Sequence, residues 1–165
     1  MMKILIATDG SEFSRAAIEE CCRLAVRSEG TEIEIVSVYE NVYPVAAEPF
    51  AVSAEYVQEM DDAARNQAHN FAAEAEKQIR ECLPGLSAEL TTKVVKGSPD
   101  QAVVEEAENW AADLLVVGSH GRGFWGRMFL GSVSQSVINH APCSVLVVRR
   151  AGSHGMRTRS RRETA

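Results

Sequence analysis

The chain has 165 residues, 45% of them hydrophobic and 24% charged, a composition typical of a single globular domain. Residues 1–148 carry 11 basic and 22 acidic side chains, whereas residues 149–165 carry six arginines against Glu163. The acidic body argues against broad nucleic-acid binding, and no apolar run approaches the ~20 residues of a membrane span. We therefore expect a cytoplasmic protein without a membrane partner.

Apolar runs and helical periodicity predict the first half of the fold. Strands are expected at residues 2–8 and 31–39, and helices at about 12–27 and 54–83. Ser11 is a suitable N-cap for the first helix, and Pro84-Gly85 would end the second. The second helix carries one apolar stripe at spacings of three and four: Val57, Met60, Ala64, Ala68, Phe71, Ala75, Ile79 and Cys82.

The second half continues the alternation. Strands are predicted at residues 88–95, 114–117 and 144–148, and helices at about 99–110 and 132–140. The third helix has a strong start, because Ser98 can cap it, Pro99 fits its first position and Gln101 completes a capping box. Cysteine and histidine spacing indicates neither a disulfide framework nor a metal site, so we expect small buried cysteines.

The order βαβαβαβαβ predicts a single-domain α/β fold, Rossmann-like, with a five-stranded parallel sheet and helices on both faces. Right-handed crossovers favour the strand order 3-2-1-4-5. Ligands bind outside the carboxyl ends of strands where such an order reverses, which here lies between the first and fourth strands. Asp9 and Gly118 follow those two strands, so both point to one crevice.

A glycine-rich stretch from Gly118 to Gly131 leads from the fourth strand to the last helix. Such a loop is a natural phosphate cradle, because backbone N–H groups and the helix dipole both face negative charge. A P-loop is excluded, since no lysine follows Gly131. The embedded Gly121-Arg-Gly-Phe-Trp-Gly126 spells GxGxxG but lacks the acidic residue expected about 20 positions later.

The spacing Gly-x2-Gly-x9-Gly-Ser is met without insertion by Gly118, Gly121, Gly131 and Ser132. Together with the opening Ile-Leu-Ile-Ala-Thr-Asp-Gly-Ser and the closing Ala-Pro-Cys-Ser-Val-Leu-Val-Val, it resembles the universal stress protein family in its ATP-binding form. The resemblance covers residues 2–149, so we take residues 1–149 as the domain. It implies ATP as the ligand, and Mg²⁺ bound through the phosphates is left open.

The resemblance also implies a set of nucleotide-binding residues. Asp9 would lie near the ribose, and the backbone of Val38 would meet adenine. Gly118 and Gly121 would pass close to the ribose and phosphates, while Ser132 and its neighbours would bind the phosphates. The full set is Ala7, Thr8, Asp9, Val38, Val117, Gly118, Gly121, Arg122, Gly131, Ser132, Val133 and Ser134.

Several of these residues have a simpler interpretation. Asp9 could serve only the Asp-Gly turn, and Ser132 could cap its helix with Gln135 completing a capping box. Arg122 and Arg127 could neutralise phosphate charge or remain solvated. His120 is read as a packing or surface residue. Phe124, Trp125, Met128 and Phe129 could cover the nucleotide, pack on the sheet or form a contact patch.

The last strand should lie at a sheet edge without lysine or proline to protect it. The resemblance implies a homodimer through this strand, Ser144–Val148. Residues 150–165 are rich in arginine and serine and should be a disordered tail. The favoured function is a nucleotide-responsive regulatory or stress-response dimer with an unknown protein partner. A slow ATPase or phosphoryl or nucleotidyl transferase, and an interaction module independent of nucleotide, remain alternatives, and no catalytic residue is assigned.

Overall fold

The computed structural model describes residues 2–25, 30–40, 53–84, 89–122 and 130–149. The predictions made for the loop residues Phe124, Trp125, Arg127, Met128 and Phe129 lie outside these ranges, as does the arginine-rich tail. None of the described helices is long and apolar enough to cross a membrane.

The strands form one parallel sheet in the order β3-β2-β1-β4-β5, which confirms the prediction. Ile6 on the central strand pairs with Ile35 on one side and Val116 on the other. Ile4, Leu5 and Ile6 are fully buried, because helices cover both faces of the sheet. The strands are β1 (Met2–Ala7), β2 (Thr31–Tyr39), β3 (Leu90–Lys96), β4 (Leu114–Gly118) and β5 (Ser144–Val148).

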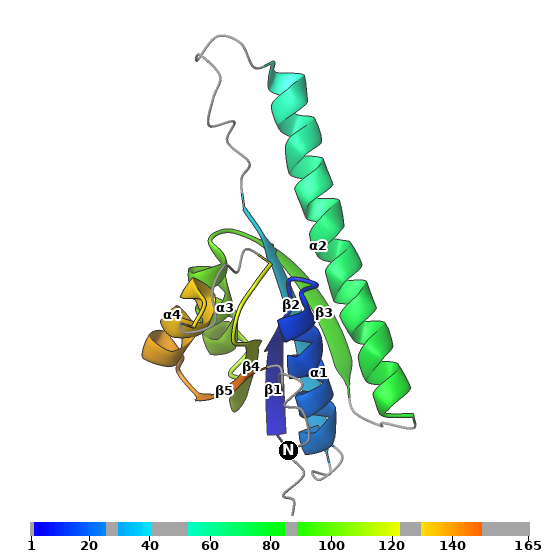
Figure 1. Ribbon diagram of the computed structural model, residues 1–165, viewed down its shortest axis with the longest axis vertical. Coiled ribbons are helices and arrows are strands. Elements are labelled where there is room, and N and C mark those ends of the chain that lie inside the picture. Colours follow the sequence, from blue (N-terminus) through cyan, green and yellow to red (C-terminus); the bar gives the residue numbers. More distant parts are fainter. Residues whose placement is uncertain (1, 26–29, 41–52, 85–88, 123–129, 150–165) are drawn as a thin grey trace, which may run out of the picture.

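Two pairs of helices cover the sheet (Figure 1). One face packs on α1 (Glu12–Ala25) and α2 (Ala54–Cys82), with Ile18 and Ile79 in the shared core. The other face packs on α3 (Pro99–Asn109) and α4 (Ser132–His140), with Val103 and Val137 in a second core. The expected apolar face of the first helix, Ile18, Cys21, Cys22 and Ala25, is buried.

The N-caps predicted from the sequence are correct for some helices and wrong for others. Ser11 caps α1 as predicted, since its Oγ accepts from the Ser14 N–H at 3.1 Å. Pro99 opens α3 as predicted, but the side chain of Ser98 does not cap that helix. Its hydroxyl donates to the Asp100 carboxylate two residues away, and this charge-assisted bond orients the side chain toward Asp100. The predicted capping box at this helix is therefore wrong.

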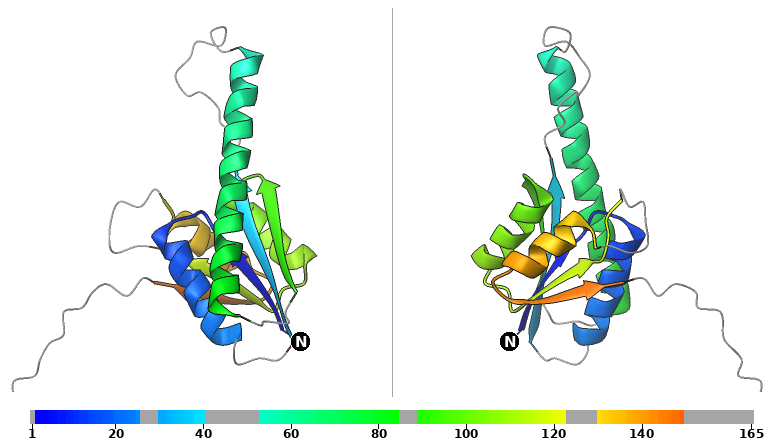
Figure 2. Two further views of the ribbon diagram at one scale, coloured as in Figure 1. Left: turned by 90° about the vertical axis from the view of Figure 1, so that its right-hand side faces the viewer. Right: turned by 60° about the vertical axis from the view of Figure 1, so that its left-hand side comes forward.

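The long helix α2 extends well beyond the sheet at its amino-terminal end (Figures 1 and 2). Its buried residues are Ala68, Ala72, Ala75 and Ile79, and Val57 at the start of the predicted apolar stripe is 40% exposed. Among the described residues, full burial along the stripe is thus confined to the part from Ala68 to Ile79, and Cys82 at its end is exposed.

Two glutamates lie buried where α3 packs beside β2 and β3, next to the half-exposed Lys93. Glu34 is 8% exposed and Glu106 is 5% exposed. Lys93 Nζ lies 2.7 Å from Glu106 Oε1 and 2.6 Å from Oε2, while Thr91 Oγ1 donates to Glu34 Oε2 at 3.4 Å. Glu34 Oε1 has no hydrogen-bond donor among the described residues. Burial first, and then the charge of Glu106, raises the pKa of Glu34.

Candidate functional site

A cavity of about 350 Å³ opens at the carboxyl ends of β1, β2 and β4. It lies at the point where the strand order reverses, which is where the topology places a ligand. Eleven of the twelve residues assigned from the sequence line it: Ala7, Thr8, Asp9, Val38, Val117, Gly118, Gly121, Gly131, Ser132, Val133 and Ser134. The structure therefore brings together segments that are more than 100 residues apart in the chain.

Asp9 joins the two loops on either side of this cavity. Its Oδ1 accepts from the Ser11 N–H at 3.0 Å, which is the turn interaction that the sequence left open. Its Oδ2 accepts from the Arg122 N–H at 3.0 Å, across the strand reversal. One carboxylate thus fixes both the β1–α1 turn and the loop after β4, while still facing the cavity.

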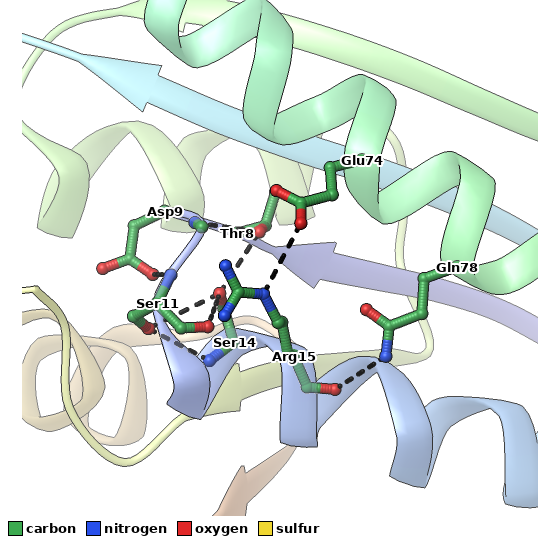
Figure 3. Close-up of polar contacts among 8 residues, drawn as sticks. Thr8, Asp9, Ser11, Ser14, Arg15, Glu74 and Gln78 are labelled. Atoms are coloured by element: carbon green, nitrogen blue, oxygen red, sulfur yellow. Dashed lines mark hydrogen bonds and ion pairs between the residues drawn. The ribbon is translucent and has the colours of Figure 1, made fainter.

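Hydroxyl groups tie the β1–α1 turn together beside the cavity (Figure 3). Thr8 Oγ1 lies 3.3 Å from Ser14 Oγ and accepts from the Gly10 N–H at 3.3 Å. Ser14 Oγ donates to the Ser11 carbonyl at 3.0 Å. Because Thr8, Ser11 and Ser14 are all buried, these bonds hold the floor of the site in one arrangement.

Two glycines lie close to other atoms, Gly118 to the backbone of Phe13 and Gly121 to the end of the Asp9 side chain. A Cβ on Gly118 would lie 2.7 Å from the backbone carbon of Phe13, so only glycine lets the end of β4 pass the first turn of α1. A Cβ on Gly121 would lie 2.9 Å from Asp9 Oδ2. These positions explain the first two glycines of the motif by packing as well as by ligand access.

The amino terminus of α4 faces the cavity through Ser132, Val133 and Ser134. Their N–H groups belong to the first helical turn, which has no partners within the helix. Gly131, in extended conformation, is the N-cap, and it has no side chain with which to cap the helix. The predicted capping role of Ser132 is therefore wrong, because Ser132 is already the first helical residue. Ser134 Oγ donates to the Gly118 carbonyl at 2.7 Å.

Arg122 is the assigned residue that does not line the cavity. Its guanidinium lies over the Phe71 ring, 4.8 Å from the centroid, and Nη2 donates to Gln67 Oε1 at 3.4 Å. It lines a neighbouring hollow of about 500 Å³ beside α2, which shares Asp9 and Val38 with the first cavity. The backbone N–H of Arg122 donates to the Asp9 carboxylate, whereas the Arg122 side chain is directed toward α2.

Sequence reasoning missed five lining residues: Ser14, Val36, Pro99, Val103 and His120. Val36 could have been found, since it shares a face of β2 with Val38. The part of α3 that carries Pro99 and Val103 could not, because the approach of α3 is tertiary. His120 packs on Phe13 with ring centroids 5.0 Å apart, as expected, and it also lines the cavity.

The site combines an apolar slot with a row of N–H donors. Valines from β2, α3 and β4 form the slot, and no lysine or arginine of the described residues lines it. The first turn of α4 supplies the donors and the positive end of a helix dipole. No group of three or more metal-binding side chains occurs in the described ranges. This arrangement suits a ligand with a flat apolar part and an anionic part.

Comparisons with family models, with sequences and with structures agree on one family. A model described as the universal stress protein family matches residues 1–149. Universal stress protein Sll1388 from Synechocystis is 32% identical, with 89% of this chain and 97% of the relative covered. A universal stress protein from Thermus aquaticus is 34% identical, with 88% and 97% covered. The structure of UspA from Lactobacillus plantarum aligns with TM-score 0.74 and 25% identity over 90% of this chain and 97% of that one.

Three other structures with this fold contain adenine nucleotides. A universal stress protein in complex with cAMP is 24% identical with TM-score 0.65, over 90% of this chain and 96% of that one. An Arabidopsis thaliana family member with AMP bound is 20% identical with TM-score 0.64, over 92% and 93%. One from Archaeoglobus fulgidus in complex with dAMP is 20% identical with TM-score 0.58, over 89% and 97%. At these identities the likeness shows the fold.

Proposed function

The chain belongs to the universal stress protein family, and from that premise we propose that it is an ATP-binding regulatory protein. The observation that carries the proposal is the cavity, in which an apolar slot opens toward the first N–H groups of α4, which have no partner within the helix. Adenine nucleotides in three proteins of the same fold support the ligand class. The glycine spacing of the ATP-binding form favours ATP within that class.

The cavity suggests how each part of the nucleotide would be held. Adenine would lie between Val38, Val103 and Val117, because a flat ring suits an apolar slot. The ribose hydroxyls would face Asp9. The phosphates would accept from the N–H groups of residues 132–134, which require no lysine. Mg²⁺ would enter on the phosphates rather than on side chains of the protein.

Calorimetric titration with ATP tests the site. We expect measurable binding to the unmodified protein and at least about tenfold weaker binding to Gly121→Val and Asp9→Ala, because one fills the cavity wall and the other removes the ribose contact and loosens two loops. Asp62→Ala removes a carboxylate on α2 away from the cavity and is the matched control. Unchanged affinity in both site variants, with folding verified by circular dichroism, would overturn the site assignment.

We further propose that residues 1–149 form the functional unit and dimerise through β5. This strand pairs only with β4, so its other edge has no partner among the described strands. ATP would bias the dimer only if it binds monomer and dimer with different affinity. Sedimentation with and without ATP tests this, and a monomer at tens of micromolar under both conditions would refute it.

A further inference from the structure

The helices α1 and α2 run side by side in the same direction over one face of the sheet (Figure 1). Two contacts of Arg15 set their register (Figure 3). Arg15 Nε lies 3.7 Å from Glu74 Oε1, and the Arg15 carbonyl accepts from Gln78 Nε2 at 3.3 Å. The first turn of α1 therefore lies opposite the stretch 74–78 of α2.

This register brings two cysteines together at the far ends of the helices. Cys22 follows Arg15 by seven residues, which is two helical turns along the same face. Cys82 follows Gln78 by four residues, about one further turn. Cys22 is buried in one core with Ile79, whereas Cys82 is exposed. The expectation that all the cysteines would be buried is therefore wrong for Cys82.

The register of the two helices places the Cys22 and Cys82 side chains as neighbours on their facing sides. Burial raises the pKa of the Cys22 thiol most, and a hydrogen bond to the Cys82 side chain raises it further. Cys21, the neighbour of Cys22, is fully buried. The contact of Cys22 with Cys82 therefore joins a core thiol to one that solvent reaches, across two helices.

We propose that Cys22 and Cys82 form a disulfide when the protein meets a hydroperoxide, which makes the ends of α1 and α2 an oxidant-modification site. The Cys82 sulfur attacks the peroxide, the O–O bond breaks, and Cys82 becomes a sulfenic acid as water or an alcohol leaves. The Cys22 thiol then gives up its proton, its sulfur attacks that of Cys82, and the S–O bond breaks to release water. Two thiols lose two electrons, and the peroxide gains them.

The difference in exposure between Cys82 and Cys22 determines which thiol meets the peroxide and which one closes the disulfide. Cys82 reacts first because it is exposed to solvent, and the buried Cys22 then attacks the sulfenic acid from the interior. Few Cys22 thiols are ionised at neutral pH, so the second step is the slower one. The site lies at the carboxyl ends of the helices, at the opposite end of the sheet from the nucleotide cavity. Oxidation thus needs no bound nucleotide.

The test treats the full-length protein with hydrogen peroxide at neutral pH and maps its peptides without reduction. We expect the peptide that contains Cys21 and Cys22 to be linked to the peptide that contains Cys82, with the loss of two hydrogen atoms in mass. The link should persist in Cys21→Ala and in the control Cys143→Ser, and should be absent in Cys22→Ala and Cys82→Ser. Since Cys82 is exposed, its variant keeps the test valid if Cys22→Ala fails to fold.

Thermal unfolding gives a second measurement. The cross-link closes a loop of about 60 residues, so oxidised protein should unfold about 10 °C higher than reduced protein. Cys82→Ser should show no such shift. A sulfinic or sulfonic acid at Cys82 without a link to Cys22, or a link only between two copies of Cys82, would overturn the proposal.

Discussion

Replacing Glu34 with glutamine should stabilise the protein, because the native carboxylate is poorly satisfied. Glu34 Oε1 has no donor among the described residues, and the facing Glu106 is also acidic. A glutamine amide can donate to the Glu106 carboxylate while its carbonyl keeps the bond from Thr91. An unsatisfied buried polar group costs about 1–3 kcal/mol, so we expect about 1–2 kcal/mol of added stability at pH 8.

The gain should depend on pH with a definite sign. The pKa of Glu34 is raised, chiefly by burial and then by the Glu106 charge, so the folded state holds this proton more tightly than the unfolded state. The stability of the unmodified protein therefore falls as pH rises from the unfolded pKa of about 4.3 to the higher folded value. Glu34→Gln cannot lose a proton, so its advantage should grow across that window and then level off.

Urea denaturation between pH 4 and pH 8 measures the difference in the free energy of unfolding between the variant and the unmodified protein. In thermal unfolding at pH 8, the Tm of the variant should be higher by about 3–6 °C. The matched control is Glu32→Gln, on the same face of β2. Glu32 lies 3.7 Å from Lys3 and is partly exposed, so its loss should lower stability by no more than about 1 kcal/mol. A destabilised Glu34→Gln at pH 8, or a gain that does not change with pH, would refute the reasoning.

Three other predictions use different parts of the molecule. Gly118→Ala should lower stability by about 1–3 kcal/mol in urea titrations, because its Cβ meets the Phe13 backbone; an unchanged midpoint would contradict this. Ser134→Ala should cost about 1 kcal/mol but change ATP affinity less than about threefold, since its hydroxyl bonds the Gly118 carbonyl; calorimetry showing a tenfold loss would argue for a direct phosphate contact. Burial raises the pKa of Cys21 to about 12, so iodoacetamide at pH 8 should label Cys82 and leave Cys21 unlabelled until unfolding, as mass spectrometry would report.

The sheet was predictable because strand and helix signals alternate without ambiguity. Continuous apolar runs such as Ile4-Leu5-Ile6 indicate a strand that is buried on both faces, and this leads to a parallel sheet and its order. Helix caps were less predictable. Ser98 and Ser132 both have suitable sequence contexts, but the first donates to Asp100 and the second lies one position inside the helix. Both outcomes depend on the geometry of the loop before the helix, which composition does not encode.

The cavity was predictable where the chain itself delivers the residue to a strand end, as with Asp9 and Gly118. The lining of the cavity was less predictable where it depends on the direction of a long side chain. The Arg122 guanidinium is directed to Phe71 because that ring is supplied by α2, about 50 residues earlier in the chain. The partner of a cysteine is hidden in the same way, since the contact of Cys82 with Cys22 follows from the register of two helices rather than from any spacing in the sequence.

The geometry of α2 has a mechanical consequence. Among the described residues, the contacts of this 29-residue helix with the sheet begin at the ion pair of Asp61 with Lys96, so the residues before Asp61 form a lever arm of about 10 Å. A tilt of the anchored part by about 10° would move the free end by about 2 Å. A small rearrangement beside the sheet is thus amplified at Tyr56, which is 49% exposed. A distance probe attached there would read out motions of the core that are too small to measure at the core itself.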